Sequence, residues 1–223
     1  ISPRIGMFPR TALLCIENTH NRGNGSALSP TDLAPLTNAA HGSGLAVHLD
    51  GARLFNASVA LGLPAIELAA SSDSVTFCLS KGLSCPAGSV VVGPADFIAR
   101  ARRVRRMVGG AMRQAGILAA AGLVALETMI DRLSDDHKNA RRLAEGLADI
   151  PGLRVNPLEI ETNIVYAELE EGGGPAMAAR LKDNGVLVNG RFDWVRFVTR
   201  REITAEDIED TIVAVREVAE RPA

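Results

Sequence analysis

The chain has 223 residues, of which 47% are hydrophobic, enough for a buried core in one large domain or two small ones. The net charge is −2 with acidic and basic residues intermixed, so no basic surface indicates nucleic acid as a partner. No apolar run approaches the roughly 20 residues that a membrane span requires, and the first residues do not resemble a signal peptide.

The cysteines and histidines indicate neither a disulfide scaffold nor a metal site. The chain has an odd number of cysteines, namely Cys15, Cys78 and Cys85, and no Cys-x-x-Cys pair. Its four histidines are scattered along the sequence. We therefore expect no metal and a reducing, cytoplasmic location. Cys78 and Cys85 flank Lys81, but we interpret them as small packing residues.

The first part of the chain runs from a connection into a strand and a loop. Residues 1–10 contain two prolines and no clear period, which predicts an edge or a connection. Residues 11–16 form a continuous apolar run, typical of a strand buried on both faces. The polar, glycine-rich residues 17–26 predict a loop placed for function or binding.

Apolar runs then alternate with helix signals. Ser29 and Pro30 supply an N-cap and a proline at the first helical position. Strands are predicted at 45–49, 74–79 and 88–92, and helices at 30–42, 52–61, 64–70 and 94–107. This alternation predicts an α/β fold with a parallel sheet and helices on both faces.

After Gly109 and Gly110 the pattern changes. Residues 112–150 favour helix, with an alanine-rich first half and an amphipathic second half from Ser134. Strands are then predicted at 153–155, 162–169, 185–188 and 194–199, and helices at 174–184 and from the N-cap Thr204 onward. We predict a large domain over 1–130 and a small α+β domain over 131–223.

Two predicted strands end in residues that suit pyridoxal phosphate. Asp50 and Arg53 follow the strand at 45–49, and Lys81 follows the strand at 74–79. Open α/β sheets bind ligands at the carboxyl ends of their strands. Pyridoxal phosphate requires a lysine, an acid that keeps the pyridine nitrogen protonated, and an arginine for the substrate carboxylate. On spacing alone, a solvated lysine and a simple Asp-Gly turn remain the alternative.

Four motifs in the same order point to a family. They are Glu-Asn-Thr-His-Asn from Glu17, His-Leu-Asp-Gly-Ala-Arg-Leu-Phe-Asn from His48, Ser-Lys-Gly-Leu from Ser80, and Gly-Gly-Ala-Met-Arg-Gln-Ala-Gly from Gly109. From about Phe8 to the final helix, the chain resembles the low-specificity L-threonine aldolases, which are aspartate-aminotransferase-like (fold type I) enzymes.

This resemblance implies a mostly parallel sheet of a large domain, incomplete here, plus a small C-terminal α+β domain. It implies pyridoxal 5'-phosphate as the cofactor and a β-hydroxy amino acid as the substrate. The reaction would be retro-aldol cleavage of L-threonine or L-allo-threonine to glycine and acetaldehyde, in a homotetramer whose neighbouring subunits share active sites.

The resemblance also implies roles for five residues. Lys81 resembles the Schiff-base lysine, and Asp50 the partner of the pyridine nitrogen. Arg53 resembles the arginine near the cofactor's phenolic oxygen and the substrate carboxylate, and Arg196 the second carboxylate-binding arginine. Arg113 resembles an arginine near the cofactor phosphate or the subunit contact.

Several of these residues have alternative interpretations. Arg113 is equally well explained as a cap of the preceding glycine turn that pairs with an acid. His48 either orients Asp50 or is a packed structural histidine, and His20 is expected to fix its loop by a hydrogen bond. We expect no chemical role for the remaining candidates, namely His41, His137 and Arg200.

Family members carry further residues before Phe8. The resemblance implies that this segment holds a phosphate-binding turn, a ring-stacking histidine and the histidine that acts as the base or positions a water as the base, so we expect this chain to be inactive alone. We expect association with that segment or a homo-oligomer. The alternatives are another fold type I lyase that acts on β-hydroxy amino acids, or a catalytically inactive fragment that serves as an assembly partner.

Overall fold

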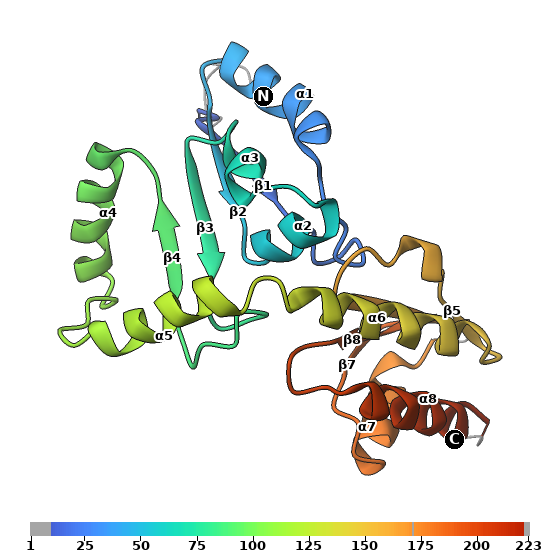
Figure 1. Cartoon of the computed structure of the whole chain (residues 1–223). Helices are drawn as coiled ribbons and strands as arrows, with labels where there is room; N and C mark the ends of the chain where they lie inside the picture. The colour runs from blue at the N-terminus through green and yellow to red at the C-terminus, as the bar shows by residue number, and fades with distance from the viewer. Residues whose placement is uncertain (1–9, 171, 221–223) are drawn as a thin grey trace. The chain divides into compact units, whose positions relative to one another are not determined.

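The computed structural model describes residues 10–170 and 172–220, which form two compact units (Figure 1). Within these residues, unit 1 comprises 10–19 and 28–130, and unit 2 comprises 20–27 together with 131 onward. The predicted connection at 1–10 lies, except for Arg10, outside the described residues. The domain boundary stays a prediction, because compactness does not establish independent folding.

Unit 1 contains a four-stranded sheet in the order β1-β2-β3-β4. Its first three strands are parallel, whereas β4 pairs antiparallel with β3. The short connection at 79–88 explains this change, because a parallel pair requires a longer crossover. The strands are β1 (Leu13–Glu17), β2 (Ala46–Asp50), β3 (Ser74–Cys78) and β4 (Ser89–Val92). The predicted α/β class and the mostly parallel sheet are confirmed.

The helices of unit 1 follow the predicted order. They are α1 (Pro30–Gly42), α2 (Leu54–Leu61), α3 (Ala65–Ala69), α4 (Ala95–Met107) and α5 (Gly116–Thr128). At the start of α1, the Asp32 backbone N–H donates to the Ser29 hydroxyl at 3.3 Å, and the Ser29 N–H donates to the Asp32 carboxylate at 2.9 Å. This reciprocal capping fixes the helix start that the sequence predicts.

Strand β2 lies in the centre of unit 1, and β1 does not. Val47 and Leu49 in β2 are fully buried. In β1 only Ile16 is buried, whereas Leu13 and Cys15 are exposed. The prediction that this strand is buried on both faces is therefore wrong for the described part of the chain, in which β1 forms an edge of the sheet and has a strand on one side only.

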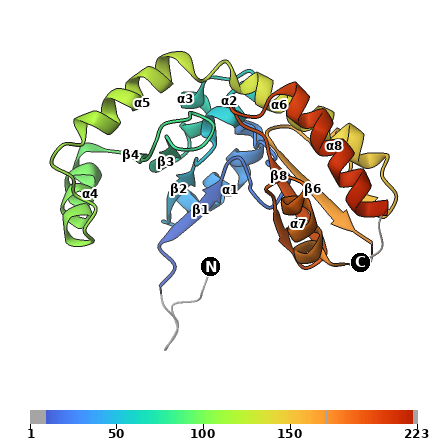
Figure 2. The ribbon, with the colours of Figure 1, turned by 90° about the horizontal axis from the view of Figure 1, so that it is seen from below.

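Unit 2 contains an antiparallel sheet in the order β5-β6-β8-β7. Its strands are β5 (Leu153–Arg154), β6 (Ile164–Leu169), β7 (Asn189–Arg191) and β8 (Trp194–Val198). Its helices are α6 (Leu133–Ala148), α7 (Gly174–Asp183) and α8 (Ala205–Glu220), with a short 3₁₀ turn at Pro157–Glu159. The two longest helices, α6 and α8, lie side by side (Figure 2).

The core of unit 2 forms between these helices and the sheet. Leu143 and Leu147 of α6 and Val215 of α8 are fully or almost fully buried, together with Val165 of β6. Gly146 allows the close approach of the two helices, because a Cβ atom there would lie 2.7 Å from Cγ1 of Ile212. Burial of this apolar face holds α6 and α8 on the sheet.

The predicted strand at 185–188 is wrong. Gly185 adopts a left-handed φ of 82° and ends α7. The Val186 backbone N–H then donates to the Leu181 carbonyl at 2.9 Å, so it closes the helix and is not available to a strand. Val186 and Val188 still pack against the core, which explains why the apolar run at 186–188 resembled a strand.

No helix in the described ranges combines the length and the hydrophobicity needed to cross a lipid bilayer.

Candidate active site

Asp50 is the last residue of β2, at the carboxyl end of the parallel part of the sheet. Its neighbours in register are Glu17 of β1 and Thr76 of β3. The side chain is exposed, and its Oδ1 accepts a hydrogen bond from the Ala52 backbone N–H at 3.1 Å. Among the described residues nothing binds the other carboxylate oxygen. Asp50 is therefore held by one hydrogen bond at Oδ1, and its Oδ2 can accept a hydrogen bond from a ligand.

The turn after Asp50 requires glycine. The Gly51 backbone N–H donates to the Thr76 carbonyl at 2.8 Å, which ties the turn to β3. A Cβ atom on Gly51 would lie 2.8 Å from that same carbonyl oxygen and 2.9 Å from the Cβ of Leu54. Only glycine fits at this position, because any side chain would collide with β3 or Leu54. Since Gly51 is buried, the Asp-Gly pair is not a simple solvent-exposed turn.

Lys81 lies on the loop that follows β3. The Ser84 N–H donates to the Lys81 carbonyl at 2.9 Å, and the Cys85 N–H donates to the Leu79 carbonyl at 3.0 Å. Leu79, Leu83 and Cys85 are buried and anchor the loop against α5, whereas the lysine side chain is exposed. No acid among the described residues pairs with Lys81.

The sheet topology brings Asp50 and Lys81 to the same end of the sheet, where the parallel strands have their carboxyl ends. Each follows the carboxyl end of its strand, and the two strands, β2 and β3, are parallel neighbours. This is the end at which open α/β sheets bind ligands. The burial of the cysteines also fits the packing interpretation: Cys85 is buried and Cys78 is half-buried.

The two other predicted arginines of unit 1 lie beside helix starts. Arg53 immediately precedes α2 and is half-buried. Arg113 lies in the connection before α5 and is exposed. Arg113 has no acidic partner in the described part of the chain. The ion pair with an acid, which was the alternative interpretation of Arg113, is therefore not seen in these residues. No described contact links Arg113 with Asp50 or Lys81.

His48 shares a face of β2 with Asp50 but binds elsewhere. Its Nδ1 lies 2.8 Å from the Ser74 hydroxyl, and its Nε2 lies 3.4 Å from the Thr76 hydroxyl. Both ring nitrogens are therefore directed toward β3. The structure favours the packed structural histidine over the histidine that orients Asp50.

Arg196 lies on β8 in unit 2, on the sheet face opposite the core residues Val195 and Phe197. Its Nη1 donates a hydrogen bond to Oδ1 of Asn21 at 2.7 Å, whereas its Nε is buried and has no partner within the described residues. Asn21 is the last residue of the Glu-Asn-Thr-His-Asn motif, but the sequence assigned it no role.

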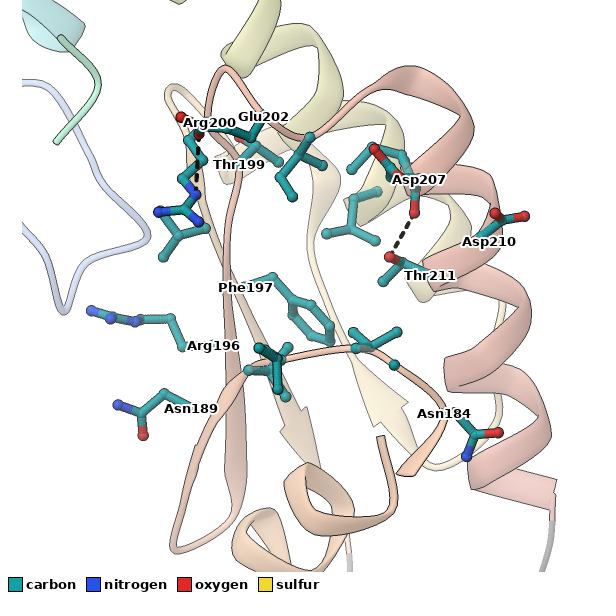
Figure 3. A pocket seen from close by; sticks show the side chains of 18 residues that line it. Asn184, Asn189, Arg196, Phe197, Thr199, Arg200, Glu202, Asp207, Asp210 and Thr211 are labelled. Carbon is teal, nitrogen blue, oxygen red and sulfur yellow. Dashed lines mark hydrogen bonds and ion pairs between the residues drawn. The ribbon is translucent and has the colours of Figure 1, made fainter. Parts of the chain in front are cut away.

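A cavity of about 750 Å³ lies beside this arginine, between residues 184–189, β8 and the start of α8 (Figure 3). Phe197 points into it, whereas Arg196 points away from its interior (Figure 3). At its rim Arg200 pairs with Glu202 at 3.3 Å. This ion pair occupies the Arg200 side chain, for which the sequence predicted no function.

Comparisons with known proteins agree with the predicted fold. The beta-eliminating lyase family matches residues 1–170. The chain is 44% identical over 209 residues to low-specificity L-threonine aldolase 1 of Arabidopsis thaliana, a match that covers 92% of this chain. It is 41% identical over 203 residues to the low specificity L-threonine aldolase of Escherichia coli strain K12. The chain spans 58% and 59% of the lengths of these two relatives.

Solved structures extend the comparison to the fold. A putative aromatic amino acid beta-eliminating lyase/threonine aldolase from Exiguobacterium has a TM-score of 0.77 at 23% identity, with 95% of this chain and 63% of that chain covered. A putative L-allo-threonine aldolase from Listeria monocytogenes has a TM-score of 0.73 at 23% identity, with 92% and 60% covered. The predicted fold type I architecture is confirmed.

Proposed function

Because this chain belongs to the beta-eliminating lyase family, we propose that it is the part of a pyridoxal phosphate-dependent aldolase that carries the lysine and the acid. The proposed reaction is cleavage of L-threonine or L-allo-threonine to glycine and acetaldehyde. The observation that carries the proposal is the placement of Asp50 and Lys81 at the carboxyl ends of neighbouring parallel strands. The similarity to named L-threonine aldolases supports the choice of substrate.

The residues at this end of the sheet fit pyridoxal phosphate. An exposed lysine without an ion-pair partner in the described chain matches the cofactor's aldehyde, and the spare oxygen of Asp50 matches its pyridine N–H. When bound, the cofactor supplies an electron sink for the pair of electrons that remains when the Cα–Cβ bond breaks. Asp50 holds the proton on the ring nitrogen, and Lys81 holds the cofactor in place.

We assign the three arginines to the binding of negatively charged groups, namely the substrate carboxylate and the phenolic oxygen and phosphate of the cofactor. Arg196 binds the substrate carboxylate, as an arginine with an unpartnered buried Nε supports. Arg53 binds the substrate carboxylate beside the phenolic oxygen of the cofactor, and Arg113 lies near the phosphate or a subunit contact. During cleavage the β-hydroxyl proton leaves as the aldehyde forms, and Cα takes up a proton. No residue of this chain is assigned as the base.

We also propose that the enzyme is a homotetramer and that it works in the cytoplasm. Large apolar side chains are exposed around α4 and α5, namely Met107, Val108, Ile117 and Leu123, with exposed fractions of 63–75%. Such a surface on a folded unit is typical of an interface. All three cysteines are unpaired, which agrees with a reducing compartment.

The test uses the natural full-length protein with pyridoxal phosphate. We expect acetaldehyde from L-threonine with the wild type and with Lys182→Ala, and none with Lys81→Ala. Lys182 is a matched control because it is an exposed lysine of α7 in the other unit. Pyruvate from L-serine without acetaldehyde from L-threonine would instead identify a β-eliminating lyase. Absence of cofactor binding would identify the chain as an inactive assembly partner.

A further inference from the structure

The loop at 20–27 belongs to the sheet of unit 2, although it follows a strand of unit 1. The His20 backbone N–H donates to the Ser26 carbonyl at 2.9 Å and the Gly25 N–H donates to the His20 carbonyl at 3.0 Å, and these bonds close the loop. Three bonds attach it to β6 and the residues before it: Asn24 Oδ1 accepts from the Tyr166 N–H at 3.0 Å, Thr162 donates to the Gly25 carbonyl, and the Ala27 N–H donates to Glu161 at 2.7 Å. The loop is therefore a fixed part of unit 2.

Asn21 is the residue of this loop that binds Arg196. Its Oδ1 accepts a hydrogen bond from Nη1 at 2.7 Å, across 175 positions of sequence, and both side chains are half-buried. A guanidinium has five N–H donors in a rigid plane, so one bond to Nη1 restricts the direction of the others. Arg196 is thus oriented by a neutral acceptor that leaves its positive charge uncompensated.

The remaining donors of Arg196 form an edge without a protein acceptor. Nε is buried and unpartnered, and Nη2 donates no hydrogen bond within residues 10–170 and 172–220. A buried donor without an acceptor is costly. A carboxylate with two oxygens matches two neighbouring guanidinium N–H groups, and such paired bonds are strong.

We propose that Asn21 is a positioning residue that fixes Arg196 through Nη1 and so presents the Nε–Nη2 edge to the substrate carboxylate. The proposal rests on the proposed function, in which Arg196 binds that carboxylate. Asn21 touches neither substrate nor cofactor in this account. It acts by holding the plane of the guanidinium from a loop that three bonds fix to unit 2, so the loss of the Asn24 bond alone leaves Asn21 in place.

The first experiment compares variants of the holoenzyme with L-threonine. Asn21→Ala is expected to raise KM by about 10- to 100-fold, the range for a hydrogen bond to a charged group, and to leave kcat within about 3-fold. Asn21→Asp keeps an acceptor for Nη1 but compensates the positive charge of Arg196, so KM is expected to stay raised in this variant. Asn24→Gly removes another loop-to-sheet bond, tolerates the positive φ of 52° at that position and should leave KM unchanged.

A second readout does not require turnover. Trp194 is the only tryptophan of the chain and lies two positions from Arg196 on the same face of β8. Titration of the holoenzyme with propionate, followed by Trp194 fluorescence, should show weaker binding for Asn21→Ala than for the wild type and Asn24→Gly. Normal KM and propionate affinity in Asn21→Ala, or equal losses in Asn24→Gly, would overturn the proposal. If Asn21→Ala weakens propionate binding but the wild type does not cleave L-threonine, the positioning role of Asn21 stands and only the proposed function is refuted.

Discussion

His137 provides a quantitative test of the electrostatics of unit 2. The structure places His137 half-buried on α6. Burial of the ring, with a smaller contribution from the charge of Arg132, lowers the pKa of His137 from 6.5 to about 4. The ring is therefore neutral in the folded protein at pH 5 and protonated in the unfolded chain.

The sign and size of the effect follow from this difference in pKa. The unfolded chain binds more protons between pH 6.5 and about 4, so the stabilising contribution is fully present above pH 6.5 and is lost as the pH falls through this range. Each unit of pKa difference corresponds to about 1.4 kcal/mol. Because the ring is partly exposed, we reduce the resulting loss at pH 5 from about 2 to about 1 kcal/mol.

Urea unfolding at pH 7 and pH 5 measures this loss. The free energy of unfolding of His137→Gln should fall by about 1 kcal/mol less than that of the wild type over this interval. An equal pH dependence in the wild type and His137→Gln, or an NMR titration of the His137 ring with a midpoint near 6.5, would refute the reasoning.

Two further predictions concern the backbone of the two units. Gly51→Ala should lower the free energy of unfolding by about 1–3 kcal/mol in urea and weaken pyridoxal phosphate binding, because its Cβ atom would lie 2.8 Å from the Thr76 carbonyl; unchanged cofactor affinity would contradict the role of this turn. Thr162→Val should lower the free energy of unfolding by about 1–2 kcal/mol, because it leaves the Gly25 carbonyl without its donor; a neutral result would show that the loop is not anchored there.

Local signals predicted the elements whose causes are local. Ser29 and Pro30 predicted the start of α1, and the N-cap Thr204 predicted that of α8, because capping involves residues three positions apart. The apolar run at 186–188 led to a wrong strand prediction, because the positive φ of Gly185 redirects the chain after α7 and hydrophobicity alone does not reveal this turn. The exposure of β1 also has a non-local cause, its position at the edge of the sheet.

The candidate site divides in the same way. Asp50 and Lys81 could be placed at one end of the sheet from the sequence, because strand ends and parallel order are encoded by local patterns. Their roles, and those of Arg53, Arg113 and Arg196, stay predictions. The bond between Asn21 and Arg196 joins residues 175 positions apart, and no local pattern in either segment predicts it.

The most direct test of the central claim is to identify the lysine that carries the cofactor. The chain has three lysines, and the two others lie on helices of unit 2, where Lys138 pairs with Asp135 at 3.0 Å. The natural full-length protein is incubated with pyridoxal phosphate, the lysine–cofactor bond is reduced with borohydride, and the labelled peptide is identified by mass spectrometry. We predict label on Lys81 and loss of label in Lys81→Ala; label spread over all three lysines, or undiminished in Lys81→Ala, would contradict the account.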